Sequence, residues 1–244
     1  MSTFAKELFA GKTAVVTGGT SGLGAGTAQY LAELGATVYA VGLGSDKADF
    51  PERLGIKVRE VDVTSDDDLT SLYAELASLD ILMPAAGISL GERELEWEPF
   101  NTVLSIQLSR VYRTIQLAHG LLAANGGSVV NVGSMYSFFG GGTRVAYSAA
   151  KGGIAQLTRS LAEAYAPDRI RVNAIAPGWI DTPLLAPLKA DQVLGERILS
   201  RTPMGRYGTP EEIGKATAFL ASDAASFITG VVLPVDGGYL VAGI

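Results

Sequence analysis

The sequence predicts an α/β fold in which a doubly wound parallel sheet of about seven strands carries helices on both faces. Short runs of β-branched and other apolar residues alternate along the whole chain with longer segments of helical character. Most of these runs are continuously apolar rather than apolar at every second position, which is typical of strands covered on both faces. No linker, repeat or low-complexity tract divides the 244 residues, so we expect one domain over residues 1–244.

The apolar runs place the expected strands in chain order. They cover residues 13–17, 37–41, 57–61, 81–85, 128–132, 171–176 and 231–235. Because a helical segment separates most consecutive runs, the connections are expected to be right-handed crossovers between parallel strands.

The helices are expected at residues 25–34, 66–79, 102–122, 145–165 and 210–221. The last begins Thr209-Pro210-Glu211-Glu212, where a capping residue, a proline at the first helical position and early acids favour a helix start. The long irregular region is residues 178–207, which we expect to be a loop with a short helix that covers a substrate site.

The composition argues against several classes of function. Acidic residues outnumber basic ones, 25 to 19, and the formal charge is -6, so we expect no nucleic-acid partner. Cysteine is absent, which removes disulfides and thiolate chemistry and is typical of a reducing cytoplasm. His119 is the one histidine, so we expect no metal site. With no signal peptide and no apolar run of about 18 residues, we expect no membrane association and a cytoplasmic location.

A glycine-rich turn follows the first expected strand. It reads Thr17-Gly18-Gly19-Thr20-Ser21-Gly22-Leu23-Gly24 and leads into a helix. Glycines at this place permit a tight turn and the close backbone approach that a diphosphate needs at a helix amino terminus. The spacing is Gly-x-x-x-Gly-x-Gly rather than Gly-x-Gly-x-x-Gly, so the alternative is an ordinary glycine-rich strand–helix turn.

Three side chains form a candidate catalytic group. Tyr147-Ser148-Ala149-Ala150-Lys151 places a phenol and an ammonium four residues apart, on one face of a helix. A free phenol has a pKa near 10, and a neighbouring cation lowers it toward the range of a useful base. Ser134 directly follows the expected strand 128–132, at the sheet edge where ligands bind in open α/β folds. Each of the three alone has a structural interpretation, but together they indicate acid–base chemistry on a substrate oxygen.

From about Lys12 to Tyr239 the chain resembles the short-chain dehydrogenase/reductase family, whose members have a Rossmann-type fold. The resemblance rests on the glycine turn, Ser134, the Tyr147/Lys151 pair, Pro177-Gly178-Trp179-Ile180-Asp181-Thr182 and the late Asp236-Gly237-Gly238, in that order. It implies hydride transfer between a nicotinamide cofactor and a secondary alcohol or ketone. Tyr147 would be the general acid/base, Lys151 would position the nicotinamide ribose and lower the tyrosine pKa, and Ser134 would polarise the substrate oxygen.

The same resemblance implies a set of cofactor-binding residues. Ile180 and Thr182 would hold the nicotinamide carboxamide, while Asp62 and Val63 would border the adenine. The full set is Gly18, Thr20, Ser21, Gly22, Leu23, Gly24, Asp62, Val63, Ala86, Gly87, Tyr147, Lys151, Pro177, Gly178, Ile180 and Thr182.

The sequence departs from the family pattern at two places. Members usually carry Asn-Asn-Ala-Gly after the fourth strand, where this chain has Pro84-Ala85-Ala86-Gly87 and therefore lacks the amide side chains. The helix asparagine that holds a water in the family's proton relay aligns with Gln107. A glutamine keeps the amide and adds one methylene, so we expect Gln107 to serve the relay with shifted geometry.

The choice between NAD and NADP depends on charged side chains that this sequence lacks near the expected adenine ribose. Gly42 stands where NAD-selective members often have an aspartate, and neither Leu43 nor Ser21 supplies the cation that NADP-selective members often have. A 2′-phosphate without a cation is poorly compensated, so we favour NAD over NADP with modest selectivity. Lys47 is close enough in sequence to reverse this preference.

Aromatic and leucine side chains near the proposed chemistry are candidates for the substrate pocket. We expect Tyr136, Phe138 and Trp179 as walls and Leu184 as part of an apolar lid. By resemblance the chain is expected to be a homotetramer that pairs through helices 102–122 and 145–165 and through residues 231–244, whose final residues are apolar.

Two alternatives remain open at this stage. Within the enzyme class, the rival is an NADPH-dependent 3-oxoacyl thioester reductase, which would need a basic docking surface such as Arg110 and Arg113. From another class, the rival is a cofactor-binding regulatory or scaffold protein that has kept the fold and lost the reaction. The intact Ser134, Tyr147 and Lys151 favour an alcohol/ketone oxidoreductase.

Overall fold

The computed structural model describes residues 3–242, and within them all seven expected strands form. They join in one parallel sheet of order β3-β2-β1-β4-β5-β6-β7, which confirms the predicted fold class. The strands are β1 (Thr13–Thr17), β2 (Thr37–Gly42), β3 (Lys57–Glu60), β4 (Ile81–Pro84), β5 (Ser128–Val132), β6 (Arg171–Pro177) and β7 (Val232–Val235). The strand order reverses between β1 and β4, so this sheet edge is where an open α/β fold binds ligands.

Eight α-helices are present among the described residues. They are α1 (Gly22–Glu33), α2 (Asp66–Ala74), α3 (Trp97–Leu104), α4 (Arg110–Asn125), α5 (Val145–Tyr165), α6 (Ala186–Ala190), α7 (Gln192–Arg201) and α8 (Pro210–Ala221). Helix α8 starts as its sequence predicts, because Thr209 and Glu212 form a reciprocal capping box and Pro210 occupies the first turn.

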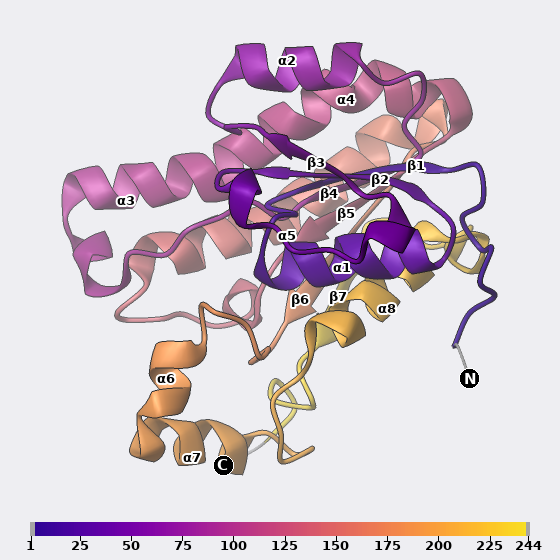
Figure 1. Cartoon of the computed structure of the whole chain (residues 1–244). Helices are drawn as coiled ribbons and strands as arrows, with labels where there is room; N and C mark the ends of the chain where they lie inside the picture. Colours follow the sequence, from indigo (N-terminus) through magenta and orange to yellow (C-terminus); the bar gives the residue numbers. More distant parts are fainter. Residues whose placement is uncertain (1–2, 243–244) are drawn as a thin grey trace.

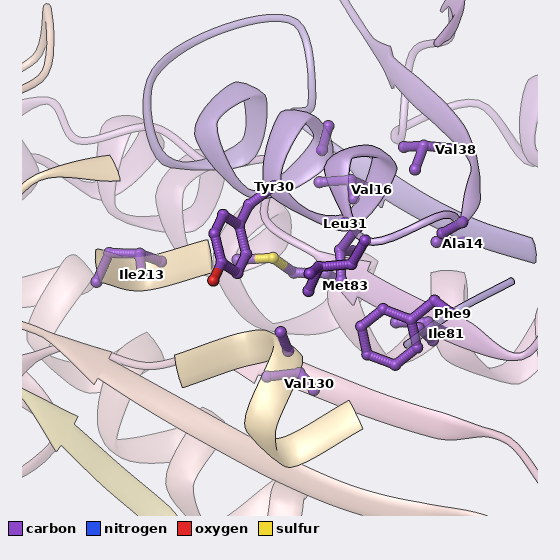
Figure 2. Close-up of a cluster of buried hydrophobic side chains, with 14 of the residues drawn as sticks. Phe9, Ala14, Val16, Tyr30, Leu31, Val38, Ile81, Met83, Val130 and Ile213 are labelled. Carbon is purple, nitrogen blue, oxygen red and sulfur yellow. The ribbon is translucent and has the colours of Figure 1, made fainter. Parts of the chain in front are cut away.

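The helices cover the sheet from both sides (Figure 1). Helices α1 and α8 pack on one face, where Leu31 and Ile213 join a buried cluster with Val16, Met83 and Val130 of the strands (Figure 2). Helices α2, α4 and α5 pack on the other face, in a second buried cluster. Because both faces are covered, the central strands β1, β4 and β5 are buried along their length, whereas the edge strand β3 is mostly exposed and carries charged residues.

The prediction of one continuous helix over residues 102–122 is wrong. The chain instead forms α3, a π-helical turn at Ser105–Ser109 and α4. The segment has no proline or other strong break at the turn, so the sequence pattern does not reveal a change from i→i+4 to i→i+5 hydrogen bonding. Such π-helical turns are frequent at functional sites.

The region 178–207 holds two helices rather than the single short one that we expected. Helices α6 and α7 follow one another with Asp191 between them, and Figure 1 shows both set apart from the sheet. The Asp191 side chain caps α7 by accepting a hydrogen bond from the backbone N–H of Leu194 (3.0 Å). The helix expected over residues 66–79 is also shorter, since α2 ends at Ala74.

Candidate active site

The loops that follow β1, β4, β5 and β6 surround a cavity of about 380 Å³. Because parallel strands end at the same edge, this cavity collects residues that are far apart in the sequence. It lies at the reversal of strand order and is also lined by Tyr147 and Lys151 from the first turns of α5.

The glycine turn is shaped by close backbone contacts. Gly18 has φ +65°, and a Cβ there would lie 2.7 Å from the Cα and N atoms of Ala86. A Cβ on Gly24 would lie 2.2 Å from the carbonyl oxygen of Gly18. Only glycine fits these two positions, and both glycines line the cavity at the start of α1. This cradle suits the diphosphate of a dinucleotide.

The candidate catalytic side chains come together beyond β5. Ser134 begins a 3-10 turn (Met135–Ser137), and its Oγ accepts a hydrogen bond from the backbone N–H of Tyr136 (3.3 Å). The Ser137 hydroxyl donates to the carbonyl oxygen of Lys151 (2.7 Å), which ties this turn to α5. The Nζ atom of Lys151 lies 5.3 Å from the ring centroid of Tyr147, so the phenol, the ammonium and the serine hydroxyl share one wall of the cavity.

Burial sets the electrostatics of this group. It raises the pKa of Tyr147, an effect that a hydrogen bond with Ser134 and the charge of Arg144 oppose. Burial also lowers the pKa of Lys151 to about 7. The Nζ atom of Lys151 donates to the carbonyl oxygen of Val132 (2.8 Å). The lysine can therefore gain or lose a proton near neutral pH beside the phenol.

Gln107 lies in the π-helical turn and lines the cavity. Its Nε2 donates to the carbonyl oxygen of Ile88 (2.6 Å), and its Oε1 is buried without a hydrogen-bond partner among the described residues. A Cβ on Gly87 would lie 2.7 Å from both amide heteroatoms, so the amide packs on the loop after β4. The free Oε1 fits a group that brings its own donor, such as a water or a cofactor hydroxyl.

A family model described as enoyl-(acyl carrier protein) reductase matches residues 18–240. That span contains the glycines of the glycine turn, Ser134, Tyr147 and Lys151. The chain belongs to the short-chain dehydrogenase/reductase family.

Known members of the family are similar over nearly their whole length. The chain is 44% identical over 247 residues to cis-4-hydroxycyclohexanecarboxylate dehydrogenase of Sinomonas cyclohexanicum, covering 96% of this chain and 98% of that protein. It is 35% identical over 246 residues to 3-oxoacyl-(acyl-carrier-protein) reductase FabG of Chlamydia muridarum (strain MoPn / Nigg), covering 95% and 98%. The solved Pseudomonas aeruginosa RhlG/NADP active-site complex is 30% identical with a TM-score of 0.89, covering 97% of this chain and 100% of that chain.

The predicted activity is confirmed at the level of reaction class. This short-chain dehydrogenase/reductase is an NAD(P)-dependent oxidoreductase that transfers a hydride between the nicotinamide cofactor and a secondary alcohol or the corresponding ketone.

Most of the site residues expected from the sequence line the one cavity. These are Gly18, Ser21, Gly22, Leu23, Gly24, Ala86, Gly87, Gln107, Ser134, Tyr136, Tyr147, Lys151, Pro177, Gly178, Trp179, Ile180, Thr182 and Leu184. Thr20, Asp62, Val63 and Phe138 are not among its lining residues. Phe138 is half exposed, and the hydroxyl of Thr20 donates to the carbonyl oxygen of Leu43 (3.2 Å).

Two residues at this site were not found from the sequence. Arg144 lines the cavity and stands three residues before Tyr147, so helical spacing from the tyrosine was a usable signal. Glu94 is buried and accepts a hydrogen bond from the backbone N–H of Tyr147 (2.9 Å). No sequence pattern pairs Glu94 with a residue 53 positions away.

Two further features concern metals and membranes. Within residues 3–242, no group of three or more histidine, aspartate or glutamate side chains is arranged to hold a metal ion. In the same part of the chain, no helix combines the length and hydropathy that crossing a membrane requires. His119 lies on α4, where its Nε2 is 2.9 Å from a carboxylate oxygen of Asp168.

Proposed function

We propose that this enzyme interconverts a small secondary hydroxy acid and the corresponding keto acid, with a carboxylate held away from the reacting carbon. The observation that carries the proposal is Arg144, a cation on the wall of a cavity that is otherwise largely apolar. Ile88, Leu184, Leu185 and Leu188 supply much of the apolar lining. Such a site fits a compact hydrocarbon skeleton with one anionic group.

The hydrogen bonds of Arg144 leave most of its guanidinium available to a ligand. Its Nη1 donates to the Ser89 hydroxyl (2.8 Å), which in turn donates to the buried carboxylate of Glu94 (2.9 Å). Ser89 thus lies between the guanidinium and that carboxylate. The remaining N–H donors of Arg144 suit a carboxylate, which binds arginine in a planar, two-pronged arrangement. Lys151, the other basic residue in the lining, is buried and donates to the backbone.

The Sinomonas relative supports the same substrate class. It is named for cis-4-hydroxycyclohexanecarboxylate, which carries a ring hydroxyl and a carboxylate on one small alicyclic skeleton. A cavity lined both by acid–base side chains and by an arginine matches that combination of groups.

In this mechanism Ser134 donates a hydrogen bond to the substrate oxygen, and Tyr147 removes the hydroxyl proton during oxidation or returns it during reduction. Protonated Lys151 favours the phenolate form of Tyr147. A nicotinamide cofactor held in this cavity would supply or accept the hydride. The glycine turn and Lys151 would hold the cofactor, and the side chains of Leu185 and Leu188 line the apolar side of the cavity.

The substrate proposal is tested by pairing an acid with its uncharged analogue. We would measure kcat/KM for cis-4-hydroxycyclohexanecarboxylate and its methyl ester with the wild type, Arg144→Gln and the control Arg93→Gln, an exposed arginine nearby. A charge-assisted hydrogen bond contributes about 1.5–3 kcal/mol, so Arg144→Gln should lower kcat/KM for the acid by about 10- to 100-fold. The ester and the control should change little.

Equal kcat/KM of the wild type for acid and ester would contradict the carboxylate site. So would an Arg144→Gln variant that keeps the wild-type value for the acid. If Arg144→Gln lowers kcat/KM equally for the acid and the ester, the substitution harms the acid–base group next to it. Arg144 would then not be a specificity residue.

The structure gives no support to the rival 3-oxoacyl thioester reductase. A 3-oxoacyl thioester reductase was expected to need a basic docking surface such as Arg110 and Arg113. Both guanidinium groups instead bind Asp66, at 2.8 Å from Nη2 of Arg110 and 2.6 Å from Nη2 of Arg113. Hydrogen bonds from Arg113 and Arg110 lower the pKa of Asp66 to about 2, so this acid neutralises part of the patch at physiological pH.

We also propose a homotetramer in which residues 1–244 form one domain in each subunit. All seven strands belong to one sheet, which supports the single domain. Exposed apolar side chains at Tyr112 of α4, Val145 of α5 and Val241 near the carboxyl end support pairing through the segments expected from the sequence. The final residues 243–244 of that expectation lie outside the described part of the chain. Light scattering at micromolar concentration that shows a monomer would contradict the tetramer. The cytoplasmic location stays a prediction.

A further inference from the structure

An acidic side chain from β3 reaches the loop that follows β2. Glu60 is the last residue of β3 and lies beside Gly42, the last residue of β2, in the strand register. Its Oε1 accepts a hydrogen bond from the backbone N–H of Gly44 (3.1 Å), and its Oε2 accepts one from the backbone N–H of Ser45 (2.8 Å). One carboxylate thus binds two consecutive amides.

This loop adjoins the glycine turn. The backbone N–H of Gly19 donates to the carbonyl oxygen of Val41 (3.0 Å), and the hydroxyl of Thr20 donates to that of Leu43 (3.2 Å). In dinucleotide-binding folds, the residue that meets the adenine ribose stands about 20 residues after the glycine turn, at the end of the second strand. The amides of Gly44 and Ser45 are therefore next to the place of the ribose 2′ position.

We propose that Glu60 is the residue by which this enzyme rejects the 2′-phosphate of NADP. A carboxylate here does two things. It places a negative charge beside the 2′ position, and it occupies two amides that a phosphate would otherwise use as donors. NAD has a hydroxyl at this position, and a carboxylate with two amide bonds still has lone pairs that can accept from that hydroxyl.

The neighbouring charges agree with this role. Hydrogen bonds from Ser45 and then from Gly44 hold the pKa of Glu60 below its usual range, so the side chain is ionised at neutral pH. Arg59, the adjacent residue, is paired with Glu75. Lys47 is exposed in the short 3-10 helix Ser45–Lys47, and Asp46 beside it carries the opposite charge.

The carboxylate of Glu60 takes the place of the acidic side chain that β2 lacks at position 42. Position 42 is glycine with φ +159°, and a Cβ there would lie 3.2 Å from the Oγ1 of Thr20. A side chain at this position would meet the glycine turn, whereas Glu60 approaches the same loop from the adjacent strand. The proposed selectivity for NAD therefore comes from a residue of β3 and not from the residues that follow β2.

The test compares cofactor affinity without turnover. We would titrate NADH and NADPH into the wild type, Glu60→Gln and the control Glu52→Gln, and follow the nicotinamide fluorescence to obtain each Kd. Glu52 is an exposed glutamate eight residues earlier, so its variant loses the same charge. Exposed charge pairs are worth up to about 1 kcal/mol each, and a phosphate carries close to two charges.

The ratio Kd(NADPH)/Kd(NADH) should therefore fall about tenfold in Glu60→Gln and stay at the wild-type value in Glu52→Gln. An unchanged ratio in Glu60→Gln would overturn the proposal. If the substitution only distorts the loop, both Kd values rise together, the ratio stays constant, and the proposal is again overturned.

Salt gives a second readout that a purely structural role would not move. Raising NaCl from about 0.05 to about 0.5 M shortens the screening length several-fold. The wild-type ratio should fall toward that of Glu60→Gln, and the ratio of the variant should move less. Parallel salt responses of the two proteins would contradict charge repulsion by Glu60. Neither measurement involves an alcohol substrate, so a failure here is distinct from a failure of the carboxylate site at Arg144.

Discussion

The carboxylate of Glu94 accepts a hydrogen bond from the backbone N–H of Tyr147, with Oε2 lying 2.9 Å from the nitrogen. Its Oε1 accepts from the Ser89 hydroxyl and from the backbone N–H of Leu90, both at 2.9 Å. Glu94 is 1% exposed, and Tyr147 stands in the first turn of α5, where backbone N–H groups have no partner within the helix. A buried acid thus holds the start of α5, and with it the candidate general base.

Replacing Glu94 with alanine should lower both stability and turnover. The change leaves three buried or half-buried donors without their acceptor, so we expect the free energy of unfolding to fall by about 3 kcal/mol. Urea unfolding measures this loss, with Glu92→Ala as the control because Glu92 is exposed on the same 3-10 helix. The Glu94→Gln variant keeps one acceptor oxygen, so its free energy of unfolding should lie between those of Glu94→Ala and Glu92→Ala. Equal stability of the two alanine variants would show that the Glu94 contacts contribute nothing.

Replacing Tyr147 with phenylalanine should abolish most turnover while cofactor binding is kept. The ring still fills its place against Tyr136, whose centroid is 5.8 Å away, but the proton that must be exchanged is gone. General acid–base groups contribute about 10²–10⁴-fold, so kcat should fall by that factor. Steady-state kinetics with a Kd for NADH measures both effects, and Tyr112→Phe on α4 is the control. A variant that retains more than about a tenth of the rate would remove Tyr147 from its assigned role.

The stability of the cofactor-free protein should rise with pH because of Lys151. Burial lowers the pKa of Lys151 to about 7 in the folded state, whereas the unfolded chain keeps the usual value of 10.5. Between these values the unfolded state binds one more proton, so the free energy of unfolding increases with pH by up to about 1.4 kcal/mol per unit.

Urea unfolding of the wild type and Lys151→Met at several pH values between about 8 and 9.5 measures this slope. The rise of the free energy of unfolding with pH should disappear in Lys151→Met. It should remain in Lys6→Met, which changes an exposed lysine. A wild-type slope that persists in Lys151→Met would assign the pH dependence to another group.

Replacing Gln107 with alanine should reduce turnover clearly and leave the Kd for the cofactor nearly unchanged. The amide donates to the carbonyl of Ile88 and has a buried oxygen without a partner among the described residues, and the family resemblance implies a proton relay through this position. Gln107→Asn keeps the same donor and acceptor groups one methylene shorter, so measurable activity should remain. Kinetics in both directions test this. Wild-type turnover of the alanine variant would exclude Gln107 from the proton path.

Several parts of this protein could be predicted from the sequence because they are encoded locally. Strands β1 and β5 and helices α5 and α8 begin and end at the expected residues, since apolar runs, capping residues and prolines are read within a few positions. The break between α3 and α4 could not be predicted, because the residues of the π-helical turn carry no local signal, and Gln107 within it is buried only in the folded chain.

The sequence by itself determined the seven strands along the chain, the glycine turn and the Tyr147–Lys151 pair. Each depends on residues that are close along the chain. Only the tertiary structure decided which distant charges meet. The carboxylate of Glu60 reaches the amides after β2 from the adjacent strand, and Arg144 comes to line the cavity with its guanidinium linked through Ser89 to Glu94. A hydrogen bond or a desolvated charge depends on distances of a few ångströms, and those distances exist only once the sheet has brought its strand ends together.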